Sequence, residues 1–220
     1  MYHGLKFSAA GKCVHVPGSD RLPPNSDVRV YPVVEQDGWI WVWPGRPELA
    51  DSMLIPEAWG LDHESMVMKT GALDYEADYQ LINDNLTDLS HLDYVHETTL
   101  SKLTGSRLSD ELPKITRLEN GLRIQRWQPA APVSPDSDDL FETWISYDYL
   151  LPGLFITKGA LYPAGTAESV DFGEPQEESL FIRLEQQAVT PTIDGHCRYL
   201  FASGAPIMSD GKGFANTEQI

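Results

Sequence analysis

Two different spacings of hydrophobic residues occur along this chain, and each predicts a different element. Most of the sequence shows strand-like alternation, interrupted by Gly, Pro and Asn. Residues 79–95 differ, because Ile82, Leu86 and Leu89 recur at i, i+4 and i+7, the spacing of an amphipathic helix. Asp78, directly before this stretch, is a suitable N-cap. The pattern therefore predicts one helix over residues 79–95 in a chain made mostly of strands.

The predicted strands lie on both sides of this helix. Before it, we expect strands at residues 5–7, 13–16, 28–34, 38–43 and 66–75. After it, Asn120-Gly121 is a strong hairpin signal between two strands, at residues 115–118 and 122–127. A loop over 129–139 is followed by strands at residues 143–151, 154–161, 179–190 and 196–203, then a loop over 204–210 and a helix from Lys212. A helix followed by an antiparallel meander indicates an α+β fold.

Four polar side chains accompany the helix: Asn85, Asp88, His91 and His96. On an ideal helix they would fall within an arc of about 140°, and a carboxylate with two imidazoles suits a divalent metal. His91 and His96 are themselves about 140° apart on such a helix. They can share a metal only if the helix ends or distorts between them. A His pair at this spacing is more often structural, so spacing alone gives only a candidate site.

The string NLTDLSHLDYVH, residues 85–96, resembles the N-x-x-D-x-x-H-x-x-x-x-H pattern of Rieske non-heme iron oxygenases. The resemblance is to the oxygenase subunit, in the vanillate O-demethylase and dicamba monooxygenase branch. It implies that His91 and His96 are iron ligands and that Asp88 links one of them to the Rieske cluster of a neighbouring subunit. Asn85 would lie near the iron. The resemblance places the third ligand, a carboxylate on a helix, beyond Ile220.

The N-terminal sequence MYHGLKF is similar to the end of the C-x-x-H-G motif of Rieske domains. The resemblance makes His3 a ligand of a [2Fe–2S] cluster, which two His and two Cys hold in a Rieske centre. The phrase GWIWVWPG, residues 38–45, resembles the end of the same domain, although by itself it is better explained as an aromatic hairpin. The chain is thus expected to hold the C-terminal part of a Rieske β domain, 1–46, and a helix-grip catalytic domain, 47–220. It would be a fragment truncated at both ends, without the last catalytic helix.

Composition restricts the partners and the compartment. With 33 acidic and 16 basic residues the net charge is −17, which argues against nucleic acid or an anionic membrane as a partner. No apolar run reaches the roughly 18 residues of a transmembrane helix, and no secretory signal pattern is present. Cys13 and Cys197 give no disulfide framework. We expect a cytoplasmic protein.

The resemblance implies the terminal oxygenase component of a Rieske system. Fe(II) and O2 would support monooxygenation of an aromatic acid, by O-demethylation or hydroxylation, with ring dihydroxylation as the neighbouring reaction. Electrons would come from NAD(P)H through a reductase or ferredoxin, and their transfer between subunits implies a homotrimer. The aromatic side chains of the predicted sheet are expected in the core rather than in a substrate pocket: Trp144, Tyr147, Phe155 and Tyr199.

Two other classes of function remain open. A hydrolytic zinc enzyme could use His91, His96 and an acid, but the chain lacks the HExxH motif. A non-catalytic helix-grip module could instead hold a hydrophobic ligand. This second interpretation becomes attractive if the fragment is the natural product, since it would then hold only part of each metal site and is expected to be inactive alone.

Overall fold

A computed structural model describes residues 3–57, 64, 66–96, 112–132 and 138–206. The chain forms two compact units, Met1–Glu57 and Ala58–Ile220. This division lies later than the expected boundary at 46/47, because the 3₁₀ turns at Pro47–Leu49 and Ser52–Leu54 group with the first unit. The assignment of the two units to a Rieske and a catalytic domain stays a prediction.

The first unit contains two small antiparallel hairpins. Strand β1 (Lys6–Phe7) pairs with β2 (Cys13–His15), and β3 (Val33–Gln36) pairs with β4 (Trp39–Val42). The second hairpin turns at Asp37-Gly38, whose φ angles of 54° and 74° are those of a type I′ turn.

The prediction of a strand at residues 28–34 is wrong for most of that range. The β3 ladder begins only at Val33, and the N–H of Val28 instead donates to the carbonyl of Gly11 at 2.9 Å, a loop contact. Alternation alone could not reveal that this stretch lacks a neighbouring strand.

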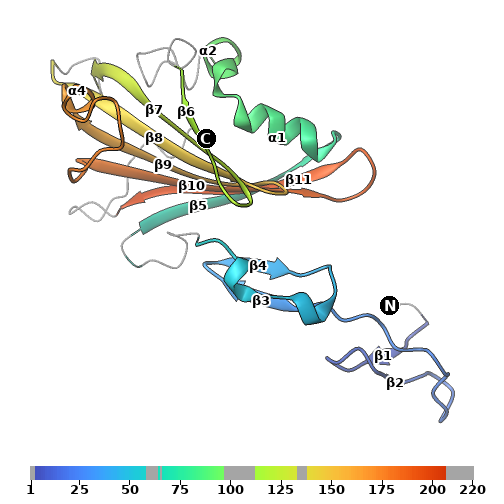
Figure 1. Ribbon diagram of the computed structural model, residues 1–220. Helices are drawn as coiled ribbons and strands as arrows, with labels where there is room; N and C mark the ends of the chain where they lie inside the picture. Colours follow the sequence, from blue (N-terminus) through green and yellow to red (C-terminus); the bar gives the residue numbers. More distant parts are fainter. Residues whose placement is uncertain (1–2, 58–63, 65, 97–111, 133–137, 207–220) are drawn as a thin grey trace. The chain divides into compact units, whose positions relative to one another are not determined.

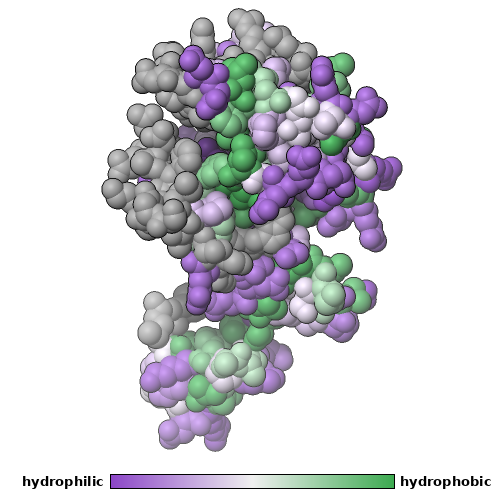
Figure 2. Space-filling view, turned by 90° about the vertical axis from the view of Figure 1, so that its left-hand side faces the viewer, coloured by the Kyte–Doolittle hydropathy of each residue, from purple (hydrophilic) through white to green (hydrophobic). Residues whose placement is uncertain are grey.

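Apolar side chains of the first unit are largely exposed. Gly11 and Cys13 are buried among its described residues, whereas Val33, Ile40 and Val42 share one open face of the β3–β4 hairpin. Figure 2 shows such apolar surface, in green, between polar groups. Within the described residues this unit therefore has little hydrophobic core of its own.

The second unit is built on an antiparallel sheet whose described residues form seven strands in the order β5-β11-β10-β9-β8-β7-β6. The strands are β5 (Met66–Tyr75), β6 (Lys114–Arg117), β7 (Gly121–Pro132), β8 (Leu140–Leu150), β9 (Leu154–Pro163), β10 (Phe181–Pro191) and β11 (Cys197–Pro206). Strands β6 to β11 form a meander, and β5 adds at the far edge beside β11. Helices α1 (Tyr79–Thr87) and α2 (Leu92–Val95) lie over one face of the sheet (Figure 1). The expected α+β class is confirmed.

The first residues of two predicted loops belong to strands in the structure. Strand β7 continues to Pro132 across the start of the loop expected at 129–139, and an irregular register between Gln128 and Ala131 accommodates Pro129. Strand β11 likewise continues to Pro206. A short helix that the pattern did not predict, α4 (Thr166–Ser169), follows β9. The helix expected from Lys212 lies outside the described residues.

Each face of the sheet carries its own hydrophobic cluster. On the face under α1, Phe155, Val189 and Cys197 pack with apolar residues of the helix, Tyr79, Ile82 and Leu86. The opposite face carries a second cluster: Trp127, Trp144, Ala160, Tyr162 and Ala167. The register separates the two, because Trp144 and Tyr149, the partner of Phe155, are an odd number of positions apart on β8. Burial of Trp144, Tyr147 and Phe155 in the core is confirmed.

We predict that Phe155→Ala lowers the free energy of unfolding by about 3–5 kcal/mol, because it empties the centre of the cluster under α1. Phe155 is 1% exposed. Urea unfolding followed by far-UV circular dichroism measures the change. The matched control is Leu151→Ala on a side chain that is 64% exposed, where a change within about 0.5 kcal/mol is expected. Equal effects of the two substitutions would contradict this core.

Candidate metal centre

The predicted single helix over 79–95 is interrupted at Asp88, so that expectation is wrong. Helix α1 ends at Thr87, and Asp88 has φ −100° and ψ 93°, an extended conformation. A 3₁₀ turn over Leu89–His91 and the short helix α2 follow. The expected N-cap is confirmed, because the carboxylate of Asp78 accepts from the N–H of Gln80 at 2.9 Å.

Asp88 itself makes the break. Its backbone N–H donates to the carbonyl of Asp84 at 3.2 Å and closes α1, while its carboxylate accepts from the N–H of Ser90 at 2.9 Å and caps the next turn. Short acidic side chains favour such local bonds over a continuous helix. The apolar spacing of Ile82, Leu86 and Leu89 predicted a continuous helix and did not reveal this local preference of Asp88.

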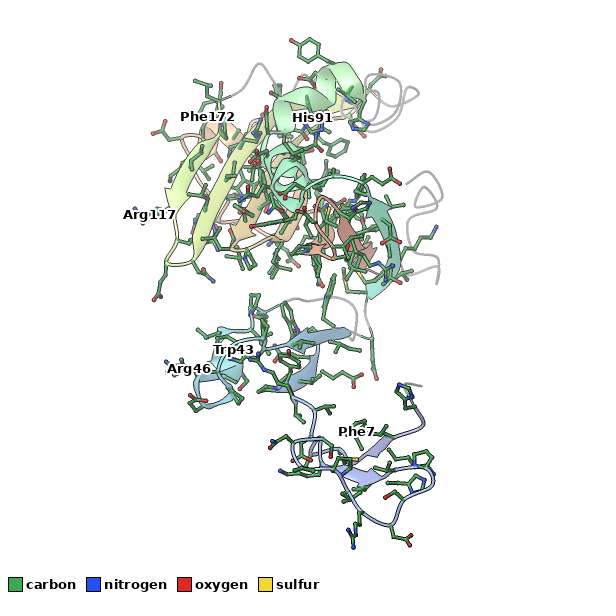
Figure 3. The ribbon with its side chains drawn as sticks, turned by 90° about the vertical axis from the view of Figure 1, so that its right-hand side faces the viewer. Phe7, Trp43, Arg46, His91, Arg117 and Phe172 are labelled. Atoms are coloured by element: carbon green, nitrogen blue, oxygen red, sulfur yellow. The ribbon has the colours of Figure 1, made fainter. Side chains whose placement is uncertain are left out.

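The two histidines lie at the two ends of the short helix α2, after the break at Asp88. His91 precedes α2 and His96 follows it, and their ring centroids lie 5.6 Å apart at an interplanar angle of 63°. Imidazole–metal bonds of about 2.1 Å place the centroids of two rings on one ion about 4.5–5.5 Å apart. Figure 3 labels His91 on the short helical segment after α1. The ring spacing lies just above this range, so a small rotation of the side chains would let both rings bind a single ion.

The tautomer of His91 follows from its contact with the backbone. Its Nδ1 lies against the carbonyl oxygen of Asp88. A carbonyl can only accept a hydrogen bond, so Nδ1 carries the proton and Nε2 keeps a lone pair. A backbone carbonyl in this position is the usual way to orient a metal-binding imidazole. His91 is thus prepared to bind a metal through Nε2.

The ligand set is not complete within the described residues. There, no group of three or more His, Cys, Asp or Glu side chains is arranged to hold a metal. The third ligand expected beyond Ile220, and Glu218, which was not assigned to that role, both lie outside the described residues. The residues present fit two ligands of a mononuclear site.

The carboxylate of Asp88 is exposed and stays charged. The hydroxyl and the N–H of Ser90 hold the pKa of Asp88 below its usual range, with a smaller contribution from the charge of Arg126. An anionic carboxylate at the surface, one turn from the His pair, can accept hydrogen bonds from a neighbouring molecule. Asn85 lies on α1 before the break with an exposed side chain, and its role stays a prediction.

His3 belongs to the first unit. Its side chain is exposed and its φ of 48° lies in the left-handed region. Since the described residues contain no group of three metal-binding side chains, they supply no complete ligand set for a [2Fe–2S] cluster. The role of His3 as a cluster ligand stays a prediction.

Two polar contacts that the sequence analysis did not predict tie α1 to the sheet. Asn83 is 4% exposed, and its Nδ2 donates to the carbonyl of Pro152 at 2.9 Å. The next residue, Gly153, is so close that a Cβ there would lie 3.1 Å from Oδ1 of Asn83. Tyr147 is 2% exposed, and its hydroxyl donates to the carbonyl of Thr87 at 3.0 Å. An Asn inside an apolar helical stripe was the available signal for Asn83; none existed for the hydroxyl of Tyr147.

Comparison with known proteins identifies the family. Residues 75–216 match the family described as vanillate O-demethylase oxygenase C-terminal domain. The chain therefore belongs to the vanillate O-demethylase branch of the Rieske oxygenases, and the resemblance seen in its sequence is confirmed.

Individual relatives agree with this family. The iron-sulfur subunit of the toluene-4-sulfonate monooxygenase system of Comamonas testosteroni is 34% identical over 176 residues, covering 76% of this chain and 50% of the relative. The oxygenase component of dicamba O-demethylase from Stenotrophomonas maltophilia is 30% identical over 208 residues, covering 92% of this chain and 58% of the relative. The chain thus spans about half the length of these relatives.

A solved structure shows the same fold. Dicamba monooxygenase with non-heme iron and dicamba superposes with a TM-score of 0.70 at 26% identity, over 93% of this chain and 57% of that one. The helix-grip arrangement expected for the catalytic domain is therefore confirmed. None of the helices in the described part is long and apolar enough to cross a membrane.

Proposed function

We propose that this protein is the terminal oxygenase component of a Rieske non-heme iron system, acting on an aromatic acid by O-demethylation or hydroxylation. The observation that carries the proposal is the convergence of His91 and His96 beside the exposed carboxylate of Asp88. The names of the relatives support an aromatic acid, since one acts on toluene-4-sulfonate and another demethylates dicamba.

His91 and His96 would hold Fe(II), together with a carboxylate expected beyond Ile220. When bound, the iron would supply the O2 chemistry of a two-histidine, one-carboxylate site. The carbonyl of Asp88 keeps the proton of His91 on Nδ1, which directs Nε2 to the ion. Asn85 would lie close to this site.

The carboxylate of Asp88 has a second role in this proposal. Being exposed and charged, it can accept a hydrogen bond from an imidazole of a neighbouring subunit. His3 of one subunit would hold the cluster that faces the Asp88 of another, so the active form would be a homotrimer. Electrons would reach it from NAD(P)H through a reductase or ferredoxin.

A polar group on the sheet face under α1 offers a contact for the acid group of the substrate. Arg183 forms an ion pair with Glu185 at 2.7 Å, and both hydrogen-bond Ser203 at 3.3 Å. Gly159, the partner of Arg183 in the register, leaves open space, because a Cβ there would meet no described heavy atom within 4 Å. Phe155 shares this face. In this proposal, the acid group of an aromatic ring beside Gly159 would share Arg183 with Glu185.

Metal binding tests the proposal directly. We predict that His91→Ala and His96→Ala each weaken anaerobic Fe(II) binding more than about 100-fold, since loss of a ligand should exceed the 10–100-fold cost of losing an outer-shell partner. Calorimetry with iron analysis measures the affinity. The matched control is His196→Ala, which removes a His whose Nδ1 also contacts a carbonyl, that of Asp194 at 3.0 Å. Undiminished binding by both site variants would exclude the proposed iron site.

The role of Asp88 is tested by Asp88→Asn. This substitution keeps a capping side chain but removes the charge, so we expect metal content to stay and product formation per NAD(P)H consumed to fall. Iron content and coupled turnover are measured together in the protein with its reductase. Normal coupling in this variant would rule out a bridging role for Asp88.

The role of Arg183 is tested by Arg183→Met, which keeps the apolar stem of the side chain. Loss of a charge-assisted hydrogen bond is expected to raise the KM for an aromatic acid about tenfold or more, with a smaller effect on kcat. Arg123→Met is the control, because Arg123 pairs with Asp148 on the opposite face of the sheet. If the two variants have the same KM, Arg183 does not contact the substrate.

A further inference from the structure

The last carbonyl of α1 is bonded by the sheet rather than by the helix. The final carbonyls of a helix have no partner within it and must find one elsewhere. The carbonyl of Thr87 accepts a hydrogen bond of 3.0 Å from the hydroxyl of Tyr147, on strand β8 and 60 positions away in sequence. Tyr147 is 2% exposed. A residue of the core therefore fixes the point where α1 ends.

The carbonyl next along the chain holds a metal-binding ring. The carbonyl of Thr87 and the N–H of Asp88 belong to one planar peptide, so the bond from Tyr147 restrains the start of Asp88. The carbonyl of Asp88 accepts from Nδ1 of His91. Two consecutive carbonyls thus connect the sheet to the imidazole, through Tyr147, Thr87, Asp88 and His91 in turn.

The surroundings of Tyr147 keep its hydroxyl a donor. Its neighbours in the register are Ile124 on β7 and Thr157 on β9, and the side chain of Arg126 also bonds its hydroxyl. Burial raises the pKa of Tyr147, so the hydroxyl keeps its proton at neutral pH. A hydrogen bond in such a poorly hydrated place is stronger than one at the surface.

We propose that Tyr147 is a positioning residue for the metal centre, because its hydroxyl holds the Thr87–Asp88 peptide in the orientation that directs Nε2 of His91 to the ion. This inference rests on the proposed function, which makes His91 an iron ligand. Tyr147 touches neither the ion nor the substrate in this role. It acts through the backbone of the break between α1 and α2.

The test is Tyr147→Phe, which removes only the hydroxyl. Co(II) serves as a spectroscopic probe for the site, and its affinity is expected to fall about tenfold, as for other outer-shell partners of metal ligands. The d–d absorption of the Co(II) that still binds should also change, because the His91 ring is less well oriented. Calorimetry and visible absorption give the two measurements.

The matched control is Tyr162→Phe. Tyr162 is 3% exposed on the opposite face of the sheet, and its hydroxyl bonds Ser179, so the control also loses a buried hydroxyl. It is expected to lower stability without changing Co(II) affinity or the spectrum. If both variants lose affinity equally, or Tyr147→Phe loses none, the positioning role of Tyr147 is overturned.

A measurement on the metal-free protein tests the role of Tyr147 independently of the proposed function. In the metal-free protein, ¹⁵N NMR of the imidazoles should show His91 protonated at Nδ1, with a mixture of tautomers in Tyr147→Phe but not in Tyr162→Phe. If the unaltered protein binds no Co(II), the proposed function fails. The tautomer comparison still decides whether Tyr147 orients His91: one unchanged tautomer in Tyr147→Phe overturns the inference, and a mixture supports it.

Discussion

Two imidazoles five positions apart cannot reach one ion from an uninterrupted helix, because they point about 140° apart. The structure meets this constraint at the end of α2, because His96, with φ −110° and ψ 25°, follows the last helical residue, Val95. His91 and His96 then lie at the two ends of α2, with their rings 5.6 Å apart. The approach of the two rings depends on this helix end, and the break at Asp88 sets where the segment that carries both histidines begins.

The sheet holds the interrupted helix in place through a few specific contacts. Apolar residues of α1 bury one side of the helix against Phe155, Val189 and Cys197. Such packing is non-directional, so it does not select where a helix ends. Two directional hydrogen bonds add to this packing. Asn83 bonds the turn between β8 and β9, and Tyr147 bonds the carbonyl of Thr87. Packing stabilises the helix on the sheet, and these two bonds determine its rotation and its last turn.

The two faces of the sheet carry different kinds of side chain. The aromatic cluster around Trp127 and Trp144 packs on the face away from α1. The face under α1 carries polar groups between its apolar residues, including the pair Arg183–Glu185. Metal-binding residues lie on the turn after α1, while the proposed substrate contacts lie on strands.

The sequence by itself determined the class of the fold, most of the strands and the two histidines. Period-two alternation gave β5 with its observed bounds, and Asn120-Gly121 gave the β6–β7 hairpin, because these signals are local. The match of residues 85–96 to a family motif singled out His91 and His96. The break at Asp88 uses local bonds to Asp84 and Ser90, but the apolar spacing predicted a continuous helix. The roles of Asn83 and Tyr147 needed the tertiary structure, because their hydrogen bonds join residues 69 and 60 positions apart, which no local pattern records.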